Sequence, residues 1–104
     1  MSVLMDFSIF PMDQGESVSA QVSEVVRMVR ESGHAYRLTP MGTVVETDSL
    51  AEALALVERA ASVLDGLGCR RVYSALKLDI RSGPSGRLTR KVESVEEHIG
   101  AVQR

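Results

Sequence analysis

The sequence has few aromatic residues and a single cysteine, and both shortages restrict what the chain can be. Two Phe, two Tyr and no Trp leave the core to Val, Leu, Ala and Met, although 44% of the 104 residues are hydrophobic. The one cysteine, Cys69, excludes a disulfide within the chain and is expected to be a small, semi-buried residue. A chain of this length is expected to form one domain, residues 1–104, with little room for a large internal cavity.

The sequence also lacks a basic block and a long apolar run. Its net charge is −2, and the cations near Arg87 and Arg90 are followed at once by glutamates, which is typical of a solvated helix face. Nucleic-acid binding is disfavoured because it usually needs a clustered positive surface and stacking aromatics. No apolar run approaches about 18 residues, and Asp6 interrupts the first one. We therefore expect no membrane partner and no signal peptide, and by default a cytoplasmic location.

Catalytic and metal-binding motifs are missing as well. No Gly-x-Ser-x-Gly sequence is present, and neither His34 nor His98 has a cysteine at zinc-site spacing. The loop glycines lack the spacing of a phosphate-binding or dinucleotide motif. Carboxylates on neighbouring strands do not by themselves make a set of metal ligands. The sequence therefore predicts no catalytic residues, no metal and no cofactor.

Hydrophobic periodicity predicts strands and helices in the order β-α-β-β-α-β, followed by a third helix. The expected strands are 3–10, 35–39, 43–47 and 70–81, and the first carries Val3, Met5, Phe7 and Ile9 on one face. The expected helices carry the stripes Val18, Val22, Val25, Val26, Val29; Leu50, Leu54, Val57, Ala61, Leu64; and Leu88, Val92, Val95, Ile99, Val102. Ser17 and Ser49 are the expected N-caps, the second in a capping box with Glu52. Gly33 ends the first helix, and Gly66 and Gly68 end the second.

This order predicts an α+β, ferredoxin-like βαββαβ sandwich with an additional C-terminal helix. One face of the sheet has no helix from the core motif. There the last strand presents Arg71, Tyr73, Lys77, Asp79 and Arg81, a mixture that is common at subunit interfaces and ligand surfaces. The stripe of the third helix needs a partner, which is either its own sheet or a neighbouring chain.

Three carboxylates, Asp6, Glu46 and Asp79, lie within predicted strands and need partners if they are buried. A structural ion-pair network is the favoured interpretation, ahead of a polar ligand site. Met41 lies in the turn between the two central strands. Ordinary packing is favoured for it over a flexible wall for an apolar or aromatic ligand.

Three stretches resemble one known family: YRLTPMGTVVE from Tyr36 to Glu46, the earlier FSIFPM and the later VYSALKLDIR. They resemble the thiamine-binding, YkoF-like family, which includes uncharacterised conserved UPF0045-type proteins. The likeness covers residues 3–99 in the same order of elements. It implies a ferredoxin-like fold assembled as dimers or dimers of dimers. It also implies binding of thiamine or its hydroxymethylpyrimidine portion without catalysis.

The matching positions are Ser8, Pro11, Tyr36, Thr39, Pro40, Met41, Gly42, Thr43, Glu46, Ser74, Lys77, Asp79 and Arg81. Of these, the expected ligand-binding residues are Ser8, Tyr36, Thr39, Met41, Gly42, Thr43, Glu46, Lys77 and Asp79. Thr47-Asp48 and Ala75-Leu76 depart from the family pattern without removing a polar group.

Each expected ligand contact follows from side-chain chemistry. Glu46 can accept from an aminopyrimidine amine, and the hydroxyls of Ser8, Thr39 or Thr43 can serve the ring nitrogens. Tyr36 or Met41 can lie against the ring. Asp79 can balance a thiazolium charge, whereas Lys77 or Arg81 would instead attract a phosphorylated ligand.

Three kinds of function remain open at this point. A non-catalytic carrier, buffer or sensor of a small molecule ranks first. A structural or regulatory oligomeric module without a ligand ranks second. A cofactor-free small enzyme ranks third, and it would need Asp6, Glu46 or Asp79 as its acid or base.

Overall fold

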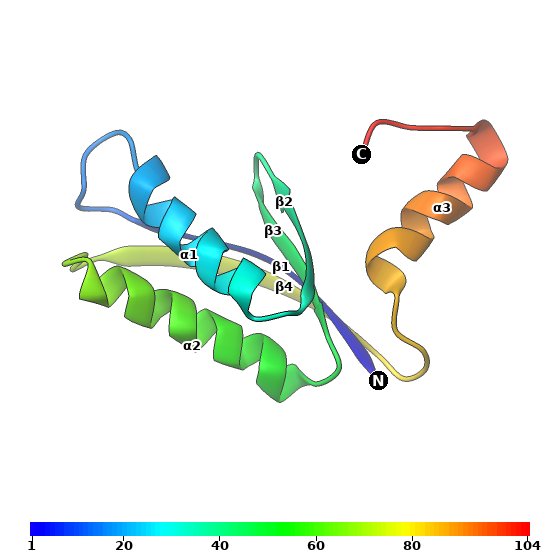
Figure 1. Cartoon of the computed structure of the whole chain (residues 1–104), viewed down its shortest axis with the longest axis horizontal. Coiled ribbons are helices and arrows are strands. Elements are labelled where there is room, and N and C mark those ends of the chain that lie inside the picture. Colours follow the sequence, from blue (N-terminus) through cyan, green and yellow to red (C-terminus); the bar gives the residue numbers. More distant parts are fainter.

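The secondary structure of the chain follows the predicted order, with the third helix after the last strand (Figure 1). The computed structural model describes all residues, 1–104. The elements are β1 (Ser2–Pro11), α1 (Ser19–Glu31), β2 (Ala35–Thr39), β3 (Gly42–Thr47), α2 (Leu50–Gly66), β4 (Val72–Arg81) and α3 (Arg87–Ile99). This confirms the α+β, ferredoxin-like fold with an added helix.

The four strands form one antiparallel sheet in the order β2-β3-β1-β4. Met5 in the central strand β1 lies opposite Val45 of β3 on one side and Leu78 of β4 on the other. Helices α1 and α2 lie together against one face of the sheet (Figure 1). Helix α3 lies beyond the other face, here called the open face, and projects away from it.

The core lies between the sheet and the pair α1 and α2. Val3, Met5, Phe7 and Ile9 of β1 are all buried, as their alternation predicts. Helix α1 adds Val25, Met28 and Val29 to this core, and α2 adds Ala53, Leu56, Ala60 and Leu64. Few large side chains are needed because the alanines let α2 approach the sheet closely. Cys69 joins the same core, which confirms its expected burial.

The predicted face of α2 is largely wrong. Leu54 is 44% exposed, Ala61 is exposed, Leu50 and Val57 are half-buried, and only Leu64 of the predicted stripe is fully buried. The core face instead follows Ala53, Leu56 and Ala60. Both faces have helical spacing in this apolar helix, so the periodicity by itself does not select between them.

Of the two predicted helix N-caps, one is confirmed and one is wrong. Glu52 donates its backbone N–H to the Ser49 hydroxyl at 3.1 Å, so Ser49 caps α2 as predicted. Helix α1 begins at Ser19, two residues after the predicted cap Ser17. Val18 occupies the cap position at φ −120° and ψ 13°, and no side chain caps this end. The Ser17 prediction is therefore wrong.

Helix α3 does not bury its apolar stripe. It ends at Ile99 before Gly100, so Val102 lies beyond the helix, contrary to the prediction. Only Arg87 in α3 is buried, whereas Val95 and Ile99 are exposed. None of the helices is both long enough and apolar enough to cross a membrane.

Candidate functional site

The turn within the stretch from Tyr36 to Glu46 is closed by Thr39, the residue that precedes it. Pro40 and Met41 join β2 to β3 as a two-residue turn. The Thr39 hydroxyl donates to the backbone oxygen of Gly42 at 2.8 Å and accepts from the Met41 N–H at 3.2 Å. Thr39 therefore closes the turn through its own side chain.

Gly42 allows this turn to lie directly against the central strand. Its φ is +155°, and a Cβ at this position would lie 3.0 Å from the backbone oxygen of Phe7. No other residue type could hold this backbone conformation so close to a carbonyl without strain. The hairpin and β1 therefore meet at one end of the sheet, below the first half of α1.

A cavity of about 430 Å³, here called the turn cavity, opens where these elements meet. Its lining residues come from β1, from the segment that leads into α1, from α1 and from the hairpin: Phe7, Ser8, Ile9, Phe10, Val18, Val22, Val25, Val26, Leu38, Thr39, Pro40, Met41, Gly42 and Thr43. Five of the expected ligand residues are among them, namely Ser8, Thr39, Met41, Gly42 and Thr43. The volume is in the range of small-molecule sites.

The turn cavity has apolar walls with a few polar groups in them. Thr43 is only 6% exposed, and its hydroxyl makes no hydrogen bond within the chain. Met41 is 88% exposed at the tip of the turn, so the interpretation that it is ordinarily packed is wrong. The turn extends past the sheet, where no other element covers Met41. A ligand in the cavity would meet one free hydroxyl, aliphatic walls and an unbranched, exposed thioether.

The valine face of α1 is the part of this cavity that sequence reasoning assigned to the core. Val18, Val22 and Val26 line the cavity, whereas Val25 lines it and also packs in the core. Their spacing of four residues was visible in the sequence, but the same spacing is expected of a core-facing stripe. Only one feature of the sequence distinguished a cavity-lining stripe from a core-facing one: the valine stripe is wider than a single buried helix face.

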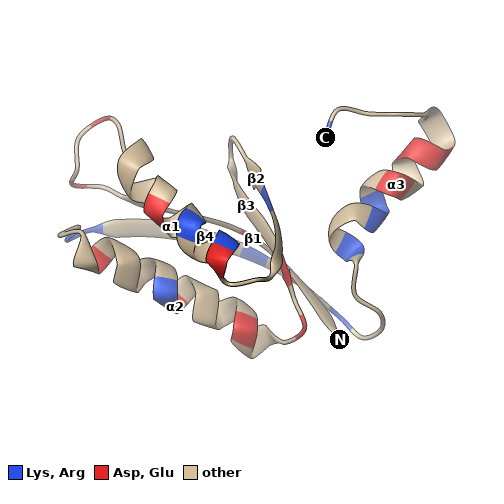
Figure 2. Cartoon of the chain, in the orientation of Figure 1, with Lys and Arg blue, Asp and Glu red and all other residues tan.

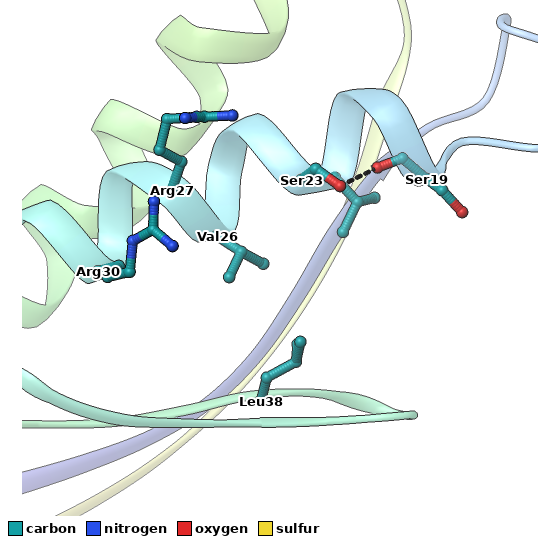
Figure 3. Close-up of a pocket in the computed structure, with 7 residues that line it drawn as sticks. Ser19, Ser23, Val26, Arg27, Arg30 and Leu38 are labelled. Carbon is teal, nitrogen blue, oxygen red and sulfur yellow. Dashed lines mark hydrogen bonds between the residues drawn. The ribbon is translucent and has the colours of Figure 1, made fainter.

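A second hollow continues along α1 on the outer side of Leu38, and it shares Val22, Val26 and Leu38 with the turn cavity. Figure 3 shows Leu38 of β2 below α1, with Ser19, Ser23, Arg27 and Arg30 along the helix. The Ser23 hydroxyl donates to the Ser19 carbonyl at 2.6 Å, and Arg27 pairs with Glu24 at 3.2 Å. This hollow is more polar than the turn cavity and is open to solvent.

Glu46 lies at the other end of β3, away from the turn cavity. Its carboxylate accepts the Ser2 hydroxyl at 2.6 Å and the backbone N–H groups of Gly86 at 2.8 Å, Arg87 at 3.1 Å and Leu88 at 3.1 Å. Burial raises the pKa of Glu46, but these hydrogen bonds outweigh it and hold the pKa below the ordinary value of 4.5.

These contacts make Glu46 the N-terminal cap of α3. The cap position of α3 is occupied by Gly86, at φ +89°, which has no side chain that could cap the helix. The first turn of α3 also contains no acidic residue. Figure 2 shows Lys and Arg in the first turns of α3 and Glu in the later ones, the reverse of what the helix dipole favours. The carboxylate from β3 supplies the missing negative charge and accepts the free N–H groups.

Arg87, which sequence reasoning assigned to a solvated face, is the buried partner in this junction. Its guanidinium donates to Asp79 Oδ2 at 2.9 Å, to the backbone oxygens of Ser2 and Asp79 at 2.7 and 2.8 Å, and to the Ser2 hydroxyl at 3.1 Å. The junction of Ser2, Glu46, Asp79 and Arg87 thus joins β1, β3, β4 and α3. No local sequence pattern distinguishes this arginine from its exposed neighbours.

The other expected ligand residues do not line the turn cavity. Tyr36 is half-buried and packs against the core. Lys77 lies on the open face, 3.6 Å from Asp6, and Asp79 belongs to the junction with Arg87. Glu46 instead lines a separate polar hollow with His34 and Asp48. The structure therefore brings together five of the nine expected residues, and ligand binding by any of the nine stays a prediction. No cluster of three His, Cys, Asp or Glu side chains could hold a metal ion.

Comparison with known proteins places most of the chain in one family. Residues 5–96 match the family described as Thiamine-binding protein. A UPF0045 protein of Mycobacterium bovis is 39% identical over 99 residues, covering 95% of this chain and 96% of that protein.

Solved structures show the same fold. A domain of unknown function from Bacillus cereus superimposes with a TM-score of 0.80 at 26% identity, covering 94% of this chain and 93% of that one. A Thermotoga maritima protein, whose name proposes a part in thiamine biosynthesis or salvage, gives a TM-score of 0.78 at 19% identity, with 91% and 99% covered.

Proposed function

Since the chain belongs to the thiamine-binding protein family, we propose that it binds thiamine or its hydroxymethylpyrimidine portion in the turn cavity, without catalysing a reaction on it. The observation that carries the proposal is Thr43, a nearly buried residue with an unpaired hydroxyl in an apolar cavity. No buried side-chain oxygen or nitrogen of the chain lacks a partner, so this hydroxyl is reached from the cavity and is available to a ligand there.

The chemistry of an aminopyrimidine matches this lining. Its two ring faces are apolar and can pack between the valines of α1 and the side of Phe7. Its ring nitrogens accept hydrogen bonds, and the hydroxyl of Thr43, which lies opposite Phe7 on the helix-covered face of the sheet, can donate one of them. Met41 at the exposed tip can close over the ring, because its unbranched side chain adapts to the shape of a ligand.

The same lining favours the pyrimidine over the thiazolium ring of thiamine. No carboxylate lines the turn cavity, so a buried thiazolium cation would lack a counter-charge there. With the pyrimidine in the cavity, the thiazolium end lies toward solvent. Hydroxymethylpyrimidine alone is then expected to bind nearly as well as thiamine.

Isothermal titration calorimetry with thiamine and hydroxymethylpyrimidine tests the proposal. Thr43→Val keeps the shape of the side chain but removes the hydroxyl, and it should weaken binding by about three- to tenfold, the effect of one hydrogen bond. Thr89→Val makes the same change on α3, outside the turn cavity, and is the matched control that should bind as the wild type does. Equal binding by wild type and Thr43→Val, or no binding of either ligand, would contradict the proposal.

The proposed role is that of a carrier, buffer or sensor, in the cytoplasm and as a homo-oligomer, either a dimer or a dimer of dimers. The unburied stripe of α3 supports an oligomer, because Val95 and Ile99 have no partner within the chain. A structural module without a ligand predicts a flat titration, and an enzyme predicts turnover of the bound compound. Product analysis after incubation with thiamine distinguishes the enzyme from the carrier.

A further inference from the structure

A cleft at the base of α3 is lined mostly by cations. It has a volume of about 300 Å³ and opens between the end of β4 and the first turns of α3. It is here called the basic cleft, and its polar lining consists of Asp79, Arg81, Arg87, Arg90, Lys91 and Ser94. Four cations and one carboxylate give this lining a net charge of +3, whereas the whole chain carries −2. The positive charge is therefore concentrated in this one place.

Helical spacing brings the α3 residues of the cleft to one side of the helix. These four residues follow one another at intervals of three, one and three positions from Arg87 to Ser94, so they share one face. Arg81 enters the same cleft from the last position of β4. The glutamates of α3 lie in its later turns (Figure 2), and none of them lines the cleft. Two elements thus direct their cations into a single space.

Three of the four cations have no acidic partner. The buried Arg87 pairs with Asp79 at 2.9 Å, and this pair uses the only carboxylate of the lining. Arg81, Arg90 and Lys91 form no ion pair in the chain. Like charges in one small cleft repel each other, and cations in the first turns of a helix also oppose its dipole. The arrangement is unfavourable in the free chain, and a bound anion would relieve it.

The frame of the cleft is fixed by contacts within the chain. The junction around Arg87 and Glu46 ties the start of α3 to the sheet. The Arg90 guanidinium is also held in place, because it donates to the Ser85 carbonyl at 3.1 Å. Its other N–H groups remain free. A cleft whose donors are already positioned loses little conformational entropy when an anion binds.

We propose that the basic cleft binds a small anion with two or more linked phosphate groups, as in inorganic pyrophosphate or the phosphate chain of a nucleotide. Arg81 and Arg90 supply the planar N–H pairs that match phosphate oxygens, and Lys91 adds a further charged donor. A single phosphate carries about −1.5 to −2 at pH 7, so linked phosphates balance the cleft more fully. A long polyanion such as nucleic acid is disfavoured, because the glutamates of α3 lie just beyond the cleft (Figure 2).

This site is separate from the turn cavity. None of its cations lines that cavity, and neither α1 nor the hairpin turn contributes to the basic cleft. Its ligand is therefore additional to thiamine or hydroxymethylpyrimidine. Titration with those two compounds does not report on the basic cleft, since neither of them carries a phosphate group.

Isothermal titration calorimetry of the full chain at low salt tests the proposal, with inorganic phosphate, pyrophosphate and ATP as the probes. We expect pyrophosphate to bind at least about tenfold more tightly than phosphate, and its affinity to fall as salt is added. Tighter binding of ATP than of pyrophosphate would identify the ligand as a nucleotide, and the reverse order would identify it as a free diphosphate. Equal affinities for phosphate and pyrophosphate, or no binding of pyrophosphate, would overturn the proposal.

Two substitutions on different elements locate the anion. Arg81→Gln on β4 and Lys91→Gln on α3 should each weaken pyrophosphate binding by about five- to tenfold. Arg59→Gln removes the same charge from an exposed position of α2, outside the basic cleft, and should bind as the wild type does. Unchanged binding by both cleft variants, or an equal loss in Arg59→Gln, would place the anion elsewhere and contradict the proposal.

Thermal unfolding distinguishes a binding role of these cations from a structural one. Without an anion, Arg81→Gln and Lys91→Gln should unfold at the wild-type temperature or slightly above it, because they remove repulsion. Pyrophosphate should raise the unfolding temperature of the wild type more than that of either variant. A marked loss of stability in both variants without the anion would show a structural role and overturn the proposal. Both variants should bind hydroxymethylpyrimidine as the wild type does, so this proposal and that for the turn cavity fail separately.

Discussion

Glu46 Oε2 accepts a hydrogen bond from the backbone N–H of Arg87 at 3.1 Å, so a strand carboxylate caps a helix 41 positions later in the chain. Two parts of the stretch from Tyr36 to Glu46 thus have different roles. The turn around Gly42 lies at the turn cavity, whereas Glu46 fixes the start of α3.

Removing the cap should destabilise the fold. Glu46→Ala leaves three N–H groups of α3 and the Ser2 hydroxyl without their acceptor, and we expect a loss of roughly 2–4 kcal/mol in the free energy of unfolding. Urea denaturation followed by circular dichroism measures it. Glu97→Ala, an exposed glutamate on α3, is the control and should change stability by less than about 0.5 kcal/mol. Similar losses in both variants would remove the capping role.

The contribution of Glu46 should depend on pH in a defined direction. Its folded pKa lies below the ordinary value of 4.5, so its charge stabilises the fold fully above that pH. The contribution is lost as the pH falls through the lower, folded pKa. The difference in unfolding free energy between wild type and Glu46→Gln should therefore be largest near pH 7 and shrink toward pH 3. A difference that grows in acid would contradict this assignment.

Gly42 should not tolerate a side chain. Alanine there combines a φ of +155° with a contact of 3.0 Å to the Phe7 carbonyl, and a cost of about 1–3 kcal/mol is expected. Gly66→Ala is the matched control, since Gly66 lies at the end of α2 with open space around it. That variant should be neutral or slightly stabilised. Thermal unfolding of both variants decides the point.

Cys69 should be a poor nucleophile in the folded protein. Burial raises the pKa of its thiol above 9.0, and the nearby charge of Asp13 raises it further. Ellman's reagent at pH 8 should react slowly with the native chain and quickly in urea. Reaction at the same rate in both conditions would show that the thiol is accessible.

The sequence was sufficient for features that depend on neighbouring residues. The strict alternation from Val3 to Ile9 predicted the buried face of β1, and Ser49 with Glu52 predicted the start of α2. Both signals act over a few residues. They do not depend on what packs against the element.

The sequence did not predict features that depend on contacts with residues far away in the chain. The core face of α2 depends on the sheet beneath it, so its two apolar stripes were equally plausible. The burial of Arg87 depends on Ser2 and Asp79, and the task of Glu46 depends on the same junction. The family resemblance grouped Glu46 and the turn in one ligand site. In the structure they lie at different ends of β3, and their positions in the sequence do not reveal this separation.

The central place of β1 has a consequence for the order in which the chain can acquire its structure. β1 is made first during synthesis, but its pairing with β4 joins Ser2 to Arg81. Half of its hydrogen-bonding groups must therefore wait until β4 has left the ribosome. Contacts of such long sequence separation slow folding. A nascent chain halted before β4 would expose its most apolar strand, and that interval is when this protein is most vulnerable to aggregation.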